Sequence, residues 1–259
     1  MSRRVVFGSL FAFILFSPIA HAVLVDVVDW TTSAGDGPLT QQATNDPIVG
    51  DGTTDSAKSE AIHAAISGTI PSLNGPGERV TLSGEVVLVG SSSSDDQFRW
   101  GLFDVNGKAT IKGWLGYFAS NAITNSESIL RERSNPNGAD FFSGTSATQI
   151  AFSNASTTAF SAGTYTFSLS LERTISDGLQ IGWGLTRTSG STVYALVGSF
   201  FDPTPQTFSF NRVGFNLGGS LNADQAQFHD ITIQHVPEPS GALMAFVGLS
   251  LIATRRARR

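Results

Sequence analysis

The segment from Tyr165 to Glu172 alternates strictly between apolar and polar side chains. The apolar set is Tyr165, Phe167, Leu169 and Leu171, and the polar set is Thr166, Ser168, Ser170 and Glu172. A period of two places the two sets on opposite faces of an extended strand, so that one face is buried and the other is polar. Val80, Leu82, Val86 and Leu88 repeat this pattern, and no long helical period competes with it.

Further strands are predicted wherever short apolar-rich runs lie between turn signals such as Asp177-Gly178 and Ser189-Gly190. They cover residues 23–30, 98–105, 114–118, 179–188, 193–200, 207–217 and 228–234. About nine short strands joined by turns are typical of an antiparallel sandwich. We therefore predict an all-β, two-sheet β-sandwich with jelly-roll-like topology over residues 23–235, in which residues 23–77 form a less regular lead-in.

Three details of this prediction depend on weaker signals. Residues 57–67 fit either a short helix or a strand, because their periodicity does not decide between the two. Residues 119–144 are polar and rich in Asn, which favours long loops. In residues 207–217 the apolar positions shift by one, and a β-bulge near Asn211 and Arg212 would produce this shift.

The first 22 residues have the three parts of a secretory signal peptide. Arg3 and Arg4 form the basic start, residues 5–16 the apolar region, and Ala20-His21-Ala22 a small-residue cleavage site at Ala20 and Ala22. We therefore expect the chain to be exported and to begin at Val23 after cleavage.

Residues 236–259 combine three features in a fixed order. Pro237-Glu238-Pro239 stops the preceding strand, because proline lacks the N–H donor. Residues 241–253 carry no charge and are expected to form a short helix in lipid, although they are shorter than a typical membrane span. Arginines 255, 256, 258 and 259 follow, as the positive-inside rule expects on the cytoplasmic side. A buried core helix is the alternative, but no polar face interrupts the run and only arginines follow it.

The order of these features resembles the PEP-CTERM sorting tail of exported bacterial proteins. The resemblance rests on Pro237, Glu238, Pro239, Arg255, Arg256, Arg258 and Arg259 and covers the last 24 residues. It implies that an exosortase, a membrane protease-transpeptidase, processes the protein on its way to the cell surface or matrix. It also implies that the C-terminal helix lies at least transiently in the inner membrane.

The body of the chain is acidic and lacks cysteine. Residues 1–22 and 240–259 contain six of the 16 basic residues and none of the 21 acidic ones, so the remaining chain carries a net charge of −11. Such a charge disfavours nucleic acid as a partner. The absence of cysteine excludes disulfides, thiol catalysis and thiolate metal sites.

The sequence offers little for catalysis. The sequence contains no G-x-S-x-G motif that would supply a nucleophilic serine to His63 or His229. Neither histidine has a second histidine at metal-binding spacing. Glycoside hydrolysis needs two carboxylates that flank the bond, and Glu85, Asp104, Glu172 and Asp230 each stand singly in or beside strands. We therefore expect a protein that is not an enzyme, with a divergent carbohydrate-active hydrolase as the alternative.

Sugar binding is the better-supported expectation, because sugars pack on aromatic rings and hydrogen-bond to polar groups beside them. The candidate ligand-binding residues are Arg99, Trp100, Asp104, Trp114 and Tyr117, with Trp183 and Asn106 also available. Since Arg99 and Trp100 are adjacent, only one of them can point into the core. Each single tryptophan also fits a role in the core.

The body also resembles, weakly, the jelly rolls of lectins and glucanases. The resemblance rests on residues 97–104 and on the closing segment 228–233. It implies polysaccharide as a ligand and allows a structural calcium ion held by loop carbonyls and an acid such as Asp230. No other cofactor is expected. The sequence thus predicts an exported surface or matrix protein with a structural or polysaccharide-binding role.

Overall fold

The computed structural model describes residues 22–34, 38–42, 45–68, 70–92, 98–121, 127–135, 142, 146–156, 158, 160–187, 194–218 and 221–238. These residues belong to one compact unit, His21–Glu238. Of the residues predicted for signal cleavage and sorting, Ala22, Pro237 and Glu238 are described. Ala20, Pro239 and the four terminal arginines lie outside the described residues.

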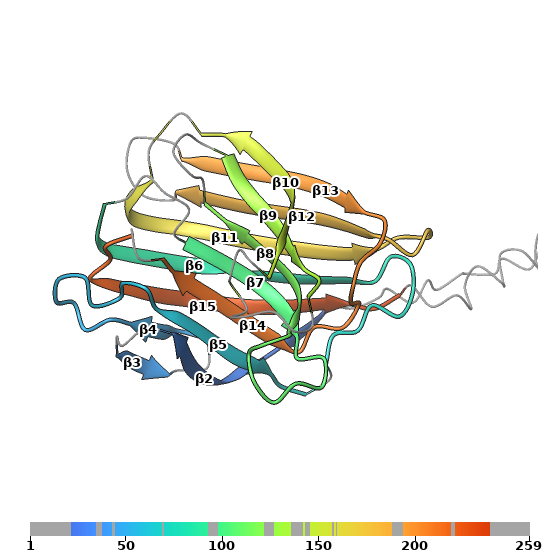
Figure 1. Ribbon diagram of the computed structural model, residues 1–259, viewed down its shortest axis with the longest axis horizontal. Helices are drawn as coiled ribbons and strands as arrows, with labels where there is room; N and C mark the ends of the chain where they lie inside the picture. Colours follow the sequence, from blue (N-terminus) through green and yellow to red (C-terminus); the bar gives the residue numbers. More distant parts are fainter. Residues whose placement is uncertain are drawn as a thin grey trace, which may run out of the picture. The chain divides into compact units, whose positions relative to one another are not determined.

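Two antiparallel sheets pack face to face (Figure 1). The first, sheet A, contains eight strands of the described chain, with β1 paired to β15 beside the main order. In spatial order they are β13 (Ala195–Asp202), β12 (Leu179–Arg187), β11 (Ser161–Arg173), β6 (Arg79–Ser92), β15 (Gln225–Val236), β4 (Pro47–Val49) and β3 (Leu39–Gln42), with β1 (Val23–Val25).

Sheet B contains seven strands of the described chain. Their order is β10 (Thr148–Ala155), β9 (Glu127–Arg133), β8 (Leu115–Ser120), β7 (Phe98–Asp104), β14 (Arg212–Leu217), β5 (Ala61–Ile66) and β2 (Val27–Ala34). Every pairing in both sheets is antiparallel. The predicted fold class, an antiparallel two-sheet sandwich, is therefore confirmed.

The core lies between the sheets and is rich in aromatic rings. Phe98 and Phe215 come from sheet B, and Phe167 and Phe228 from sheet A. The rings of Phe215 and Phe228 are 4.4 Å apart between centroids, and Phe167 meets Phe215 edge-on at 5.2 Å. Such contacts add to the free energy gained by burying the apolar surface.

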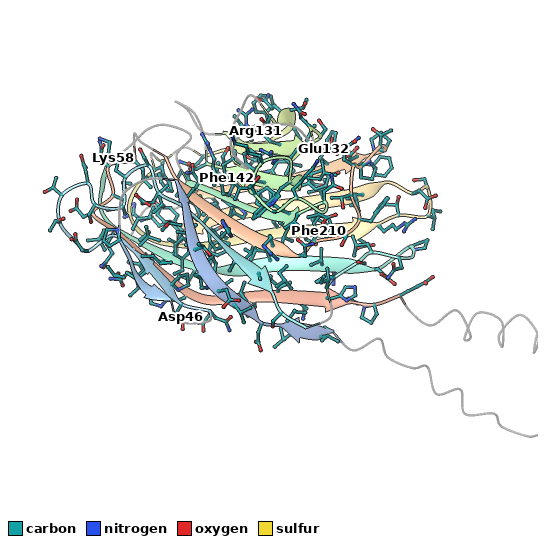
Figure 2. The ribbon with its side chains drawn as sticks, turned by 60° about the horizontal axis from the view of Figure 1, so that its bottom comes forward. Asp46, Lys58, Arg131, Glu132, Phe142 and Phe210 are labelled. Atoms are coloured by element: carbon teal, nitrogen blue, oxygen red, sulfur yellow. The ribbon has the colours of Figure 1, made fainter. Side chains whose placement is uncertain are left out.

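A second, smaller apolar cluster covers the outer face of sheet B. Phe103 and Phe118 alternate with inward-facing residues, so they point away from the main core, where Trp114 and Phe142 cover them. Phe142, labelled in Figure 2, meets Phe118 edge-on with ring centroids 5.2 Å apart. No such layer lies over the outer face of sheet A in the described part of the chain, so the two outer faces differ in their access to solvent.

Residues 61–66 form strand β5, so the strand alternative for residues 57–67 holds and the helical one does not. One local prediction was wrong. Residues 127–133, expected in a loop, form strand β9 because Ile129 and Leu130 supply buried positions among the polar residues.

The bulge expected near Asn211 and Arg212 is also absent. Strand β14 begins at Arg212 and pairs with β7 without a shift of register. The apolar positions shift there because the preceding residues follow a different path, with a single bridge between Ser72 and Ser209.

Candidate binding groove

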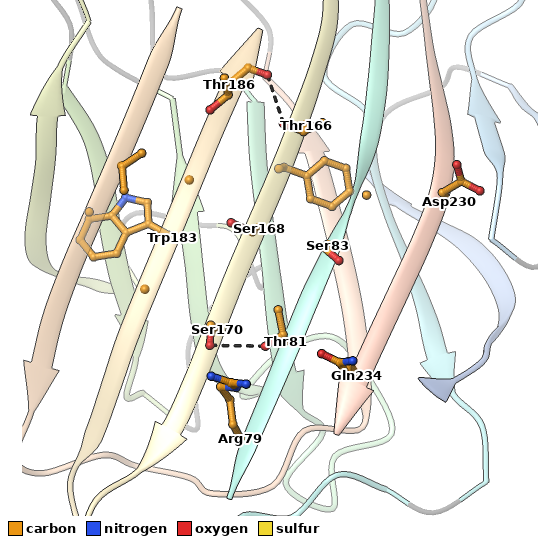
Figure 3. Close-up of a pocket in the computed structure, with 16 residues that line it drawn as sticks. Arg79, Thr81, Ser83, Thr166, Ser168, Ser170, Trp183, Thr186, Asp230 and Gln234 are labelled. Atoms are coloured by element: carbon orange, nitrogen blue, oxygen red, sulfur yellow. Dashed lines mark hydrogen bonds between the residues drawn. The ribbon is translucent and has the colours of Figure 1, made fainter. Parts of the chain in front are cut away.

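A shallow groove crosses the outer face of sheet A (Figure 3). It spans strands β15, β6, β11, β12 and β13, and most of the side chains that line it are small and polar. The lining residues are Arg79, Thr81, Ser83, Gly84, Thr166, Phe167, Ser168, Ser170, Gly182, Trp183, Gly184, Thr186, Val197, Gly198, Asp230 and Gln234.

The strand register arranges two rows of residues across the sheet, of which all but Ser199 and Thr232 line the groove. The first row is Gln234, Thr81, Ser170, Gly182 and Ser199, and the second is Thr232, Ser83, Ser168, Gly184 and Val197. Neighbouring strands are about 4.8 Å apart, so five strands give each row a length of about 19 Å. This length suits an extended chain better than a single small molecule.

Hydroxyl groups hold one another in place along these rows. The hydroxyls of Ser83 and Thr232 share a hydrogen bond of 2.9 Å, and Thr81 Oγ1 donates to Ser170 Oγ at 3.4 Å. Each hydroxyl is one donor and two acceptors, so capacity for a ligand remains. The floor is therefore a neutral, hydroxyl-rich surface.

Two glycines keep the floor free of side chains. A Cβ atom on Gly182 would meet no other atom within 4 Å, and one on Gly184 would make only ordinary contacts, the nearest at 3.4 Å. Neither local packing nor a positive φ requires glycine at these positions, although glycine weakens a strand. Glycine inside a strand often marks the close approach of a ligand or another backbone, and we interpret the pair in this way.

A β-bulge in β15 turns Asp230 toward this face. The register with β6 shifts between His229 and Thr232, and Asp230 has a φ of 51°. Its backbone N–H donates to Asp46 Oδ1 at 2.8 Å. As a result the exposed Asp230 side chain lies at the edge of the groove (Figure 3). The preceding residue, His229, lies opposite Glu85 of β6 in the strand register.

Larger side chains border the first row. Arg79 and Glu172, opposite each other on β6 and β11, form an ion pair of 3.9 Å, and Gln180 Nε2 donates to Ser199 Oγ at 2.9 Å. The ring of Phe201 is 41% exposed and continues this border on β13. Phe201 lies beside the groove and is not one of its lining residues.

The aromatic residues predicted to bind a ligand lie elsewhere. Trp100 and Tyr117 are fully buried in the main core, where Trp100 Nε1 donates to the carbonyl of Ser168 at 2.9 Å. Trp114 is buried in the cluster outside sheet B. Their rings are not open to solvent, so they form no exposed platform in this structure.

The two polar members of that predicted set have structural partners. Arg99 Nη1 donates to the carbonyl of Phe142 at 3.0 Å, on the side of β7 opposite to Trp100, so only one of these neighbours points into the core, as expected. Asp104 accepts hydrogen bonds from Thr207 and Asn211 at 3.2 and 3.1 Å. The five residues come from two strands of sheet B and the segment between them, and the groove lies on the other sheet.

A buried polar cluster joins the sheets. Tyr117 Oη lies 2.6 Å from Asp202 Oδ2 and 3.1 Å from Glu132 Oε1. A phenol has one proton to donate, so one of these contacts needs a proton on a carboxyl group. Burial, and then the nearby Asp202 carboxylate, raise the pKa of Glu132 above its usual range. The cluster has no opening to the groove among the lining residues.

Among the described residues, His63 packs against an aromatic ring, and the possible metal ligands are not grouped. His63 meets the ring of Trp114 edge-on at 5.0 Å, and burial together with the charge of Arg212 lowers its pKa to about 4. It is therefore neutral at neutral pH. Within the described ranges, no three His, Cys, Asp or Glu side chains are grouped so that they could hold a metal ion.

Among the described residues, no helix is long and apolar enough to cross a membrane. Residues 241–253 lie outside the described residues.

Comparison with known proteins gives similarity of fold. No protein-family model matches the chain, and no curated protein matches it. Among solved structures, arcelin-5, a lectin-like defense protein from Phaseolus vulgaris, is 7% identical, with 83% of this chain and 98% of that chain covered and a TM-score of 0.51.

Two further solved structures illustrate the range of similar proteins. A lectin from Bauhinia forficata in complex with GalNAc is 12% identical over 84% of this chain and 98% of that chain, with a TM-score of 0.48. The PL-14 alginate lyase from Aplysia kurodai is 9% identical over 80% and 89%, with a TM-score of 0.49. At these identities the likeness concerns the fold alone. The two antiparallel sheets and the similarity to arcelin-5 give the chain a lectin-like jelly-roll fold.

Proposed function

We propose that this chain is an exported, non-catalytic protein that binds polysaccharide in the groove on the outer face of sheet A. The observation that carries the proposal is the pair of rows across five strands, in which every position except Gln234 and Val197 is Ser, Thr or Gly. A sugar chain presents hydroxyls that both donate and accept, and Ser and Thr hydroxyls match them in both roles.

The surroundings of the groove support this proposal. The floor is uncharged, and Phe201 offers an exposed ring on which a sugar ring can pack. Arg79, Asp230 and Gln234 add polar groups at its borders. The outer face of sheet B is covered by its own apolar cluster, which leaves sheet A as the accessible face. The similarity in fold to arcelin-5, a lectin-like protein, agrees with a binding role.

Export to the cell surface or matrix forms the second part of the proposal. It is supported by the signal-peptide pattern of residues 1–22 and the PEP-CTERM pattern of residues 236–259. In this proposal an exosortase processes the tail, whose apolar run lies at least transiently in the inner membrane. The acidic body would then carry the groove outside the cell.

Substitution at Gly182 tests the groove. Affinity electrophoresis of the full-length protein in detergent, against a panel of neutral and acidic polysaccharides, should show retardation by at least one of them. Gly182→Leu projects a side chain into open space, so it should leave stability intact and weaken binding about tenfold or more, equal to about 1.4 kcal/mol.

Two controls accompany this variant. Gly182→Ala adds little bulk and should bind as the wild type does, and Gln149→Leu adds the same side chain to an exposed position of β10 in sheet B. Equal binding by Gly182→Leu would exclude the groove as the site. Absence of retardation by every polysaccharide would contradict the binding function itself.

A further inference from the structure

One end of the sandwich gathers the segments that surround the last described residue, Glu238. Strand β15 ends at Val236, which pairs with Arg79 at the start of β6, and β1 pairs with the same end of β15 through Val23 and His235. Figure 1 shows the end of β15, the loop before β6 and the β11–β12 hairpin on the same side of the molecule. We call this region, made of residues 23–26, 67–68, 70–79, 172–178 and 236–238, the tail end.

Backbone contacts tie these segments together. Gly77 N–H donates to the carbonyl of Arg173 at 2.8 Å, and Arg173 Nη1 donates to the carbonyl of Leu73 at 2.7 Å. Ser67 N–H donates to the carbonyl of Asp26, next to β1, at 2.9 Å. The tail end is therefore one connected surface.

This surface exposes large apolar side chains. Ile175, at the tip of the β11–β12 hairpin, is 90% exposed, and Leu24 and Val23 in β1 are 68% and 52% exposed. Ile70, between Ser67 and Leu73, is 44% exposed. Single exposed apolar residues are common, but these four all lie at the end of the sandwich where the described chain ends.

The chain stays in contact with the folded body up to Glu238, the last described residue. Pro237 is half-buried, and the carboxylate of Glu238 packs so closely on Gly75 that a Cβ atom there would overlap it. The apolar run in the sequence starts at Gly241, three residues later. Three fully extended residues reach about 10 Å. The headgroup layer of one leaflet is roughly 5–8 Å thick, so a tether of this length holds the tail end at the lipid headgroups once the run is inserted.

We propose that the tail end rests on the surface of the lipid bilayer, with Ile175, Leu24, Val23 and Ile70 entering the headgroup layer. This inference rests on the proposed function, because it requires that residues 241–253 insert into the membrane. It adds a second, peripheral contact between the folded domain and the lipid.

The charges of the tail end indicate which headgroup charge the lipid surface should have. Asp26, Asp177 and Glu238 are exposed acids. The two arginines of this region have acidic partners, since Arg173 pairs with Asp177 at 3.0 Å and Arg79 with Glu172 at 3.9 Å. An anionic surface would repel the remaining acids. The tail end therefore fits zwitterionic lipid better than anionic lipid.

Single cysteines can test this contact, because the chain has none of its own. The full-length variants Ile175→Cys and Leu24→Cys, each labelled with an environment-sensitive fluorophore, are reconstituted into phosphatidylcholine vesicles and isolated by flotation. Their emission should shift to the blue, and a quencher attached to lipid headgroups should reduce it. Including an anionic phospholipid in the vesicles should weaken both effects.

Val89→Cys is the matched control. Val89 is 40% exposed on the same sheet but pairs with Gln225 at the opposite end of β15. Ten residues of strand separate it from Arg79, a distance of about 34 Å. Its label should behave as it does in water.

The outcomes separate the two proposals. Flotation without a blue shift or quenching at Ile175→Cys and Leu24→Cys would overturn the peripheral contact and leave the inserted tail intact. Failure of every variant and of the wild type to float would overturn membrane insertion of residues 241–253, and the peripheral contact with it. Equal quenching at Val89→Cys would also contradict the specific orientation.

Discussion

The indole ring of Trp183 lies directly against Gly198 on the neighbouring strand β13. The same ring donates from Nε1 to Ser128 Oγ of sheet B at 2.6 Å. Trp183 therefore connects the two sheets below the groove, and it can do so because Gly198 has no side chain.

A methyl group at Gly198 should disturb this arrangement. Gly198→Ala would place its Cβ atom inside the indole ring, so Trp183 must move. We expect a loss of about 1–3 kcal/mol in the free energy of unfolding, as for other overpacked sites, measured by urea denaturation. Gly182→Ala on the adjacent strand meets no atom within 4 Å and should cost nothing. Equal stability of both variants would refute this account.

The cluster of Tyr117, Glu132 and Asp202 should make stability depend on pH. The pKa of Glu132 is raised in the folded protein, while the unfolded chain titrates near the ordinary value of 4.5. The cost of ionising Glu132 is absent below that value, grows as pH rises above it and is complete above the raised pKa. Glu132→Gln should flatten this decline and stabilise the protein at neutral pH.

Tyr117→Phe tests the same cluster from the other side. It removes the hydroxyl that contacts both buried carboxyl groups and should cost about 1–3 kcal/mol. Thermal unfolding across a pH series measures both variants. His63, whose pKa is lowered to about 4, adds a change of opposite sign, so the test is the difference in stability between the wild type and Glu132→Gln. A difference that does not change with pH above the ordinary pKa of glutamate would contradict this account.

The bulge at Asp230 should tolerate few residue types. A φ of 51° is accessible to Asp and Asn but strained for a β-branched residue. Asp230→Val should lose about 1–2 kcal/mol of stability, whereas Asp230→Asn should keep the fold. Calorimetric titration with a bound polysaccharide then shows, through Asp230→Asn, what the negative charge contributes. A stable Asp230→Val variant would mean that the bulge does not depend on this residue.

The groove is expected to bind without cleaving. Asp230 is the carboxylate among its described lining residues, and Glu85 lies nearby in the register with His229. Incubation with a bound polysaccharide should release no new reducing ends. Release that is abolished by Glu85→Gln or Asp230→Asn would instead support the alternative of a divergent hydrolase.

The sorting tail predicts an effect in the producing cell. Replacing Glu238, or the arginines at 255, 256, 258 and 259, should impair surface delivery or processing. Cell fractionation and the mass of the mature protein measure this effect. Unchanged location and mass in both variants would remove the support for the tail assignment.

The sequence predicted the fold class because the period of two is a local signal. Strands β11 and β12 bury every second residue, so their pattern can be read without knowing their neighbours. Strand β9 escaped prediction because sheet B is buried on both faces there, as Arg133 is fully buried and its Nε donates to the carbonyl of Trp114 at 2.8 Å. In a sequence, a charged residue such as arginine is normally assigned to an exposed position, so a buried arginine hides the strand.

The candidate site could not be derived from the sequence in the same way. Trp100 and Trp114 are the residue types that bind sugars, but the same rings also fill cores, and the sheet order decides which role they take. The rows of the groove join residues as far apart in sequence as Ser83 and Thr232. One local signal was present, since Gly182 and Gly184 flank Trp183 in a strand that has no need of glycine.

The position of β15 has a mechanical consequence. This strand runs directly into the tail and lies inside sheet A, bonded to β6 along one side and to β4 and β1 along the other. Tension applied along the strand from its C-terminal end would load many of these hydrogen bonds together, in shear, instead of opening them one after another. A protein held by its tail, as proposed above, would therefore resist unfolding when force acts between the tail and a ligand bound in the groove.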